Sequence, residues 1–215
     1  MEEIIKVRFR FEKTGSAAFI SHLDLMRTLG RALSRAGIPA AKTNGFNPHA
    51  YISIPCALSL GYEGTEEMAD IGLPMTFQSS LIPERMNNVL PDGIRVSAAY
   101  PITRKSGEIA SADYSLLFEA SAEEKEAVIA ALSQKPLIVL KKSKRNEEEK
   151  DISSMILDIK TTENGISARL VCSAAENLNP RMLLAALEKV APEHMPTHVR
   201  IRRESFYDAA GKEFK

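Results

Sequence analysis

The sequence predicts an α+β protein made of two ferredoxin-like units, each a split βαβ arrangement with an antiparallel sheet and with extra strand or hairpin material. The order strand, helix, strand, strand, helix, strand can be traced twice along the 215 residues. A polar stretch at residues 101–112 contains Gly, Ser and Pro and separates the two series. The length also suits two small domains. The predicted units are residues 1–103 and 112–208, and the pattern leaves open whether they share one sheet.

The first unit is expected to begin with a strand. Residues 4–11 alternate apolar and basic side chains, which is typical of a half-buried strand with Val7, Phe9 and Phe11 inward and Arg8 and Arg10 outward. Further strands are predicted at residues 51–60, 67–73 and 94–100, and a second helix is predicted from residue 79 or 80 to about 90.

The first predicted helix lies within residues 19–36, where apolar side chains recur at the helical period. Ser21 is the expected N-cap with Asp24 at the third position, and Gly37 follows the last turn. Arg27, Arg31 and Arg35 are spaced four apart and are expected to line up as a basic stripe. The face predicted to be buried carries Phe19, Leu23, Met26, Leu29 or Gly30, and Leu33.

The second unit repeats this order. Ser121 and Glu124 form a capping box for a helix that ends near residue 133, and Asn179 caps a helix that ends near residue 190. Asn164 followed by Gly165 is a strong hairpin signal. Strands are expected at residues 114–120, 137–140, 156–160, 166–172 and 198–206. A charged loop is predicted at 141–151, and a frayed tail is predicted after Tyr207.

The charge balance excludes a protein that is basic everywhere. Lys and Arg number 28 and so do Asp and Glu. Residues 1–50, however, carry eight basic and four acidic side chains, whereas residues 51–135 carry six basic and twelve acidic ones. No apolar run approaches the roughly 20 residues that a membrane helix needs, and the N-terminus lacks the features of a secretory signal. We therefore expect a cytoplasmic protein with a basic N-terminal region and no membrane partner.

Several classes of enzyme leave motifs that this sequence lacks. There is no P-loop, dinucleotide fingerprint, nucleophile elbow or iron–sulfur cysteine cluster. Cys56 and Cys172 are too few for a disulfide framework and are expected to be buried, reduced thiols. No cofactor or resident metal is predicted. Whether the chain catalyses any reaction stays open, and a non-catalytic role is favoured.

The candidate site residues cluster between residues 22 and 51. His22, in the first turn of a helix, and His49 are the candidates for acid–base chemistry, because a histidine can exchange protons near neutral pH. An arginine stripe suits phosphate, and an exposed Phe beside amides suits stacking on a base. The predicted substrate-binding residues are Asp24, Arg27, Arg31, Asn44, Phe46, Asn47 and Tyr51.

Two motifs in this region carry a resemblance to a known family. They are Phe-x-Ser-His-Leu-Asp at residues 19–24 and Gly-Phe-Asn-Pro-His at residues 45–49. With this separation the chain resembles the radical SAM-linked proteins, a bacterial family of unknown function. The resemblance covers nearly the whole chain and is strongest in residues 1–100. The sequence departs from the family pattern at Ala50, where a Pro is common, and at residues 64–68.

The resemblance implies an accessory partner of a radical SAM protein, because the family is encoded beside such a protein or fused to it. Ribosomal protein genes and a ribonuclease gene often lie nearby, which implies an RNA or ribosomal substrate. Two alternatives from other classes stay open. One is a stand-alone RNA-binding or RNA-processing protein, and the other is a small-molecule or metal-dependent enzyme that uses His22, His49 and Asp70.

Overall fold

The chain divides into two compact units, Met1–Glu108 and Ile109–Lys215. The computed structural model describes residues 3–142 and 147–215. The division falls inside the predicted linker at 101–112. The end of that linker was predicted wrongly, however, because residues 109–112 already belong to a strand of the second unit. Their apolar side chains Ile109 and Ala112 are buried.

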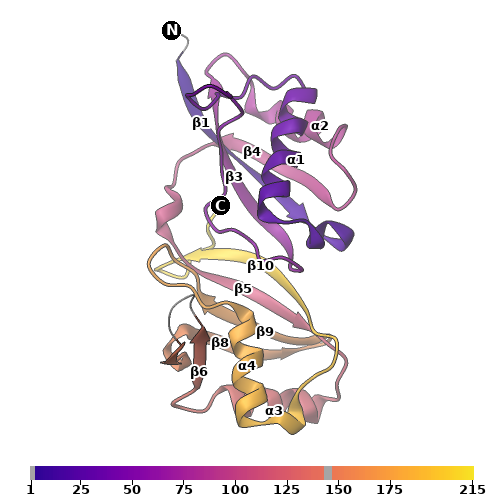
Figure 1. The fold of residues 1–215 in the computed structure, drawn as a ribbon, viewed down its shortest axis with the longest axis vertical. Helices are drawn as coiled ribbons and strands as arrows, with labels where there is room; N and C mark the ends of the chain where they lie inside the picture. The colour runs from indigo at the N-terminus through magenta and orange to yellow at the C-terminus, as the bar shows by residue number, and fades with distance from the viewer. Residues whose placement is uncertain (1–2, 143–146) are drawn as a thin grey trace. The chain divides into compact units, whose positions relative to one another are not determined.

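The first unit is a small antiparallel sheet with helices (Figure 1). Its strands lie in the order β4-β1-β3-β2, and every neighbouring pair is antiparallel. Short 3-10 turns at Gly15–Phe19 and Ser79–Leu81 precede the two helices. The elements are β1 (Ile4–Lys13), α1 (His22–Arg35), β2 (Ile52–Ser53), β3 (Glu63–Pro74), α2 (Ile82–Asn87) and β4 (Ile94–Pro101).

One face of this sheet packs on both helices. Val7, Phe9 and Phe11 of β1 are fully buried, as the alternation predicted, and they belong to one core cluster with residues of α1 and α2. The predicted buried face of α1 is wrong in its first turns. Its core side chains are Leu25, Leu29, Ala32 and Leu33, whereas Phe19 and Leu23 are 75% and 60% exposed.

The second unit is built in the same order, with one addition. Its main strands lie in the order β10-β5-β9-β8 with antiparallel neighbours, and β6 and β7 form a separate two-stranded sheet. Helices α3 and α4 pack on each other, and α3 also packs on β8 and β9. The elements are β5 (Ile109–Leu117), α3 (Ala122–Leu132), β6 (Ile138–Lys142), β7 (Glu147–Asp151), β8 (Ile156–Thr162), β9 (Gly165–Val171), α4 (Pro180–Val190) and β10 (Arg200–Asp208).

The helix-start signals at Ser21, Ser121 and Asn179 are confirmed, whereas the helix expected from residue 79 or 80 begins at Ile82 without a side-chain cap. The Ser21 hydroxyl accepts a hydrogen bond from the backbone N–H of Asp24. Ser121 and Glu124 form a complete capping box. Asn179 accepts from the backbone N–H of Arg181 at the start of α4. These bonds satisfy backbone donors that a helix start leaves without an intrahelical partner.

Longer-range expectations fail at four places. The strand predicted at 51–60 shrinks to the two residues of β2. The charged loop predicted at 141–151 includes β7, and residues 143–146 lie outside the described residues. The C-terminal tail is ordered, because Phe214 is buried and its N–H donates to the Phe206 carbonyl. Of the two cysteines, Cys172 is buried but Cys56 is only half-buried.

The structure thus has mixed α+β architecture with antiparallel sheets. Among the described residues, no helix is both long and apolar enough to cross a bilayer.

Candidate functional site

The first motif is held in place by a buried lysine. The Lys13 ammonium donates to the Ala18 carbonyl at 2.8 Å, and the Gly61 N–H donates to the same carbonyl at 2.9 Å. Burial lowers the pKa of Lys13, and the nearby Glu67 carboxylate opposes that shift. These contacts hold the turn before α1, and Phe19, the last residue of that turn, is exposed to solvent.

Asp24 organises the start of α1. Its carboxylate accepts from the Ser21 hydroxyl at 2.7 Å and from the Arg27 guanidinium at 3.0 Å. The hydrogen bond from Ser21 and the contact with Arg27 lower the pKa of the Asp24 carboxyl. Asp24 and Arg27 are therefore brought together, but as parts of a helix cap. His22, the first residue of the helix, is exposed beside them.

The predicted arginine stripe exists, and its members differ in how they are engaged. Arg27 pairs with Asp24, and Arg35 donates to the Val89 carbonyl at 3.1 Å. Arg31 is exposed, and its guanidinium makes no hydrogen bond or ion pair within the described part of the chain. Arg31 is thus the stripe member whose guanidinium is free for a ligand.

The second motif forms a tight surface loop. The Thr43 N–H donates to the His49 carbonyl at 2.8 Å, and the His49 N–H donates to the Thr43 hydroxyl at 3.3 Å. His49 Nδ1 lies 3.1 Å from the Asn47 carbonyl and 3.2 Å from the Thr43 hydroxyl. His49 therefore closes the loop with one ring nitrogen. Phe46, at its tip, is fully exposed.

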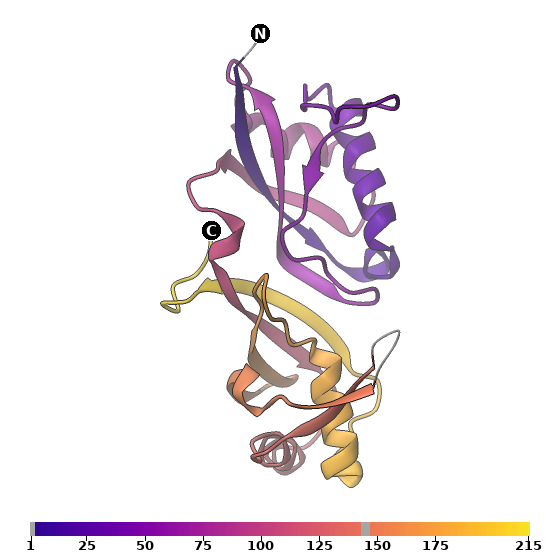
Figure 2. The same ribbon diagram turned by 60° about the vertical axis from the view of Figure 1, so that its left-hand side comes forward.

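The remaining loop candidates surround that tip. Asn44, Asn47 and Tyr51 are all exposed, and the Tyr51 N–H donates to the Ala41 carbonyl at 2.8 Å. The loop follows the C-terminal end of α1, as Figures 1 and 2 both show.

The structure does not bring His22 and His49 together. The start of α1 is tied to Gly61 through Ala18, whereas the loop is tied to Gly72 through a bond from the Ala41 N–H to the Gly72 carbonyl. Gly61 lies just before β3 and Gly72 lies near its C-terminal end, so most of that strand, about 30 Å at ~3.3 Å per residue, separates the two anchors. A single pocket holding both imidazoles is therefore ruled out.

The metal alternative fails on the same geometry. Asp70, its proposed carboxylate, is held by the Arg8 guanidinium through two hydrogen bonds of 2.7 and 2.9 Å. No group of three or more His, Cys, Asp or Glu side chains suited to a metal occurs among the residues described.

Sequence analysis missed a polar cluster on the first sheet. Arg8 was expected to face solvent, yet its side chain is 1% exposed and pairs with Asp70, directly opposite on β3. On the same strand, Arg10 pairs with Glu66 at 2.8 Å. Tyr100 lies opposite Arg8 on β4, and burial raises the pKa of its hydroxyl. Strand alternation correctly separates the two faces but does not reveal that Arg8 is buried on the second one.

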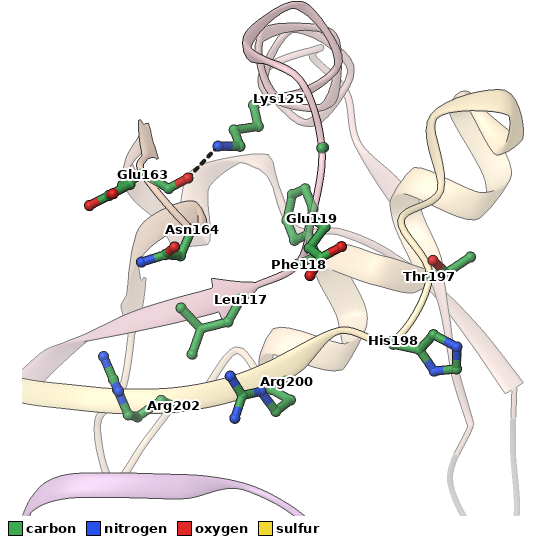
Figure 3. Close-up of a pocket in the computed structure, with 11 residues that line it drawn as sticks. Leu117, Phe118, Glu119, Lys125, Glu163, Asn164, Thr197, His198, Arg200 and Arg202 are labelled. Atoms are coloured by element: carbon green, nitrogen blue, oxygen red, sulfur yellow. Dashed lines mark hydrogen bonds between the residues drawn. The ribbon is translucent and has the colours of Figure 1, made fainter.

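A pocket in the second unit was also missed. It has a volume of about 740 Å³ and is lined by the end of β5 and the start of α3, the β8–β9 turn, and the segment that enters β10 (Figure 3). Its charged and polar lining residues are Glu119, Lys125, Glu163, Asn164, Thr197, His198, Arg200 and Arg202. The basic residues near 200 were the available signal, but sequence spacing alone does not place them beside residues 117–125.

A family described as "uncharacterized protein conserved in bacteria (DUF2344)" matches residues 6–182. The chain belongs to this family. The DUF2344 match includes both motifs and runs through the first turn of α4, while the strand β10 lies beyond it.

Comparison with other proteins adds little. No curated protein matches the chain. A crystal structure of an unknown protein from Galdieria sulphuraria aligns over 99% of this chain and 100% of its own, with 14% identity and a TM-score of 0.28. A score of this size does not establish a common fold.

Proposed function

We propose that this DUF2344 protein is a non-catalytic accessory partner of a radical SAM enzyme and that it binds the enzyme through the first unit. One observation carries the proposal: both motifs that underlie the family resemblance present large apolar side chains to solvent. Phe19, Leu23 and Phe46 are 75%, 60% and 106% exposed. Burying such side chains against another protein is favourable, at about 25 cal/mol per Å² of apolar surface. Their exposure is unexplained by the fold of the unit itself.

The geometry favours a macromolecular partner over a small substrate. Leu23, Arg27 and Arg31 follow one another at four-residue steps along the exposed face of α1. This face extends about 20 Å, at 1.5 Å per residue over 14 residues, from the first motif toward the loop of the second. Aromatic and arginine side chains are enriched in protein interfaces. We call the exposed residues of 19–31 and 43–51 the motif surface.

The strand order of each unit supports a more specific fold. We infer that each unit is ferredoxin-like, with the β6–β7 hairpin inserted in the second. The support is the element order, two strand–helix–strand series, combined with strand orders β4-β1-β3-β2 and β10-β5-β9-β8 and antiparallel neighbours throughout. A split βαβ unit places its fourth and third strands on either side of its first.

RNA is the second candidate ligand of the motif surface. A fully exposed Phe46 between Asn44 and Asn47 can stack on a base while the amides bond its edge, and Arg31 is free for phosphate. An RNA that uses the motif surface would compete with the protein partner for it.

The test is an affinity measurement with a purified radical SAM protein from the same genome, the partner that the family resemblance implies. We expect Leu23→Ala and Phe46→Ala each to weaken the complex at least about tenfold, because truncating a buried apolar anchor removes more than about 1.4 kcal/mol. Leu157→Ala is the matched control, since Leu157 is 53% exposed in the second unit. Absence of a wild-type complex, or an equal loss in the control, would contradict the proposal. Adding RNA to the same mixture shows whether the two ligands compete.

A further inference from the structure

The pocket of the second unit has an uneven distribution of charge. Arg200 and Arg202 are two residues apart on β10 and face Leu117 and Ser115 of β5. Residues two apart on a strand point to the same side, so the two guanidinium groups line one wall. Figure 3 shows them across Leu117 from Glu163 and Asn164 of the β8–β9 turn.

The wall formed by Arg200 and Arg202 has N–H donors that no described protein group uses. Arg202 Nε donates to the Glu204 carboxylate at 2.7 Å, and the Ser115 hydroxyl donates to the same oxygen at 2.6 Å. One of the five guanidinium donors of Arg202 is thus used in this pair. Arg200 pairs with Leu117 through the strand backbone, and its guanidinium makes no hydrogen bond or ion pair to any described residue. Two adjacent guanidinium groups with free N–H donors match the oxygens of a phosphate.

The opposite wall is rigid and accepts hydrogen bonds. The Lys125 ammonium donates to the backbone carbonyls of Thr162 and Glu163, which ties α3 to the turn. The Phe118 N–H donates to the Asn164 carbonyl at 3.0 Å. Glu119 and Glu163 are exposed and can accept from hydroxyl or amine groups. Two carboxylates on this wall suit the neutral part of a ligand whose phosphate lies at the arginine wall.

Segment 197–198 forms the third side. His198 has a φ of 55°, which is unusual for a residue other than glycine. Among the described residues, it is the one non-glycine residue with a positive φ. This backbone turn precedes β10 and leaves Thr197 and His198 in the pocket lining. A conformation of this kind is commonly kept at ligand sites, where the surrounding fold holds it.

We propose that this pocket binds a nucleoside 5′-monophosphate. The phosphate lies at Arg200 and Arg202, the nucleoside packs along Leu117, and its hydroxyl and amine groups donate to Glu119 and Glu163. A volume of about 740 Å³ is much larger than one phosphate needs and falls within the range of small-molecule sites. The ligand is either a free nucleotide or the 5′ end of an RNA, which share this chemistry. The site is separate from the motif surface and does not depend on the proposed partner.

Calorimetry on the full chain tests this site with four probes: a mixture of the four nucleoside 5′-monophosphates, the same nucleosides without phosphate, inorganic phosphate, and a 5′-phosphorylated RNA tetranucleotide. We expect saturable binding of the monophosphates and at least about tenfold weaker binding of both the nucleosides and inorganic phosphate. Binding of the tetranucleotide alone identifies an RNA end as the source and still supports the site. Failure of every phosphorylated probe to bind would overturn the proposal.

Binding measurements on variants distinguish a specific site in this pocket from non-specific attraction between charges. Arg200→Gln should weaken binding at least about tenfold, because a charge-assisted contact is lost. Arg181→Gln removes an equally exposed guanidinium from α4, in the same unit, and should leave binding unchanged. Glu119→Ala should weaken nucleotide binding without weakening that of inorganic phosphate. Equal losses in the Arg200 and Arg181 variants would overturn the proposal.

Discussion

The Arg8–Asp70 pair shows how a single strand position affects stability. Arg8 is almost fully buried and Asp70 is 16% exposed, and two hydrogen bonds join them. Asp70→Ala leaves the guanidinium buried without a counter-charge, and we expect it to lower the free energy of unfolding by about 3–5 kcal/mol. Urea unfolding followed by circular dichroism measures this loss.

A more accessible pair on the same sheet provides the control. Glu66 is 34% exposed and pairs with Arg10, so Glu66→Ala should cost about 1 kcal/mol or less. If Asp70→Ala is no more destabilising than Glu66→Ala, the burial assigned to the Arg8 pair is wrong.

Residue roles were predictable where they depend on near neighbours. Ser21 and Asp24 are three residues apart, and their capping contact follows from that spacing alone. Asp70, the partner of Arg8, is 62 residues away in the sequence. The alternation therefore predicted the face of the strand on which Arg8 lies but not that Arg8 is buried. His22 and His49 were grouped because they are close in sequence, yet the chain between them passes along a helix to the far end of the sheet.

At the scale of elements, the capping box of α3 links stability to pH. Ser121→Ala should lower the free energy of unfolding by about 1 kcal/mol at pH 7, because the hydroxyl accepts from the Glu124 N–H. The Ser121 N–H and hydroxyl also lower the pKa of Glu124 below its ordinary value. That contribution is complete above the unfolded-state pKa and is lost as the pH falls through the folded-state pKa.

The difference between Ser121→Ala and the wild type should therefore narrow in acid. Thermal unfolding across the acidic range measures it. Ser133→Ala, at the opposite end of α3, is the control and should change stability by less than about 0.5 kcal/mol. The variant keeps the backbone N–H that donates to Glu124, so a difference that stays constant, or widens as the pH falls, would show that the Ser121 hydroxyl does not stabilise the ionised Glu124.

Elements were predicted best where one pattern dominates. Three predictions were correct: the Asn164-Gly165 hairpin, the capping box of α3 and the alternating side chains of β1. Each depends on a local pattern that the tertiary structure keeps. The start of α1 was misread because apolar residues occur on two of its faces, and the period does not say which one meets the sheet. β7 was taken for a loop because all of its residues are charged.

At the scale of the whole molecule, the repeated element order was recoverable and the sites were not. Helix and strand signals are local, so two similar series can be traced without knowing their packing. The pocket needs three segments, near residues 120, 164 and 200, that only the tertiary structure assembles. The motif surface was partly foreseen, since its residues were singled out, but His22 and His49 were named together as acid–base candidates, and they lie far apart.

Oxidative footprinting of this chain, alone and mixed with the proposed radical SAM partner, tests the central claim most directly. Hydroxyl radicals modify exposed apolar side chains, so free protein should react at Phe19, Leu23 and Phe46. Complex formation should protect these three and leave Met75, which is 53% exposed in the same unit, and Leu157 as reactive as before. A complex in which Phe19, Leu23 and Phe46 react at the rate of the free protein would contradict the account.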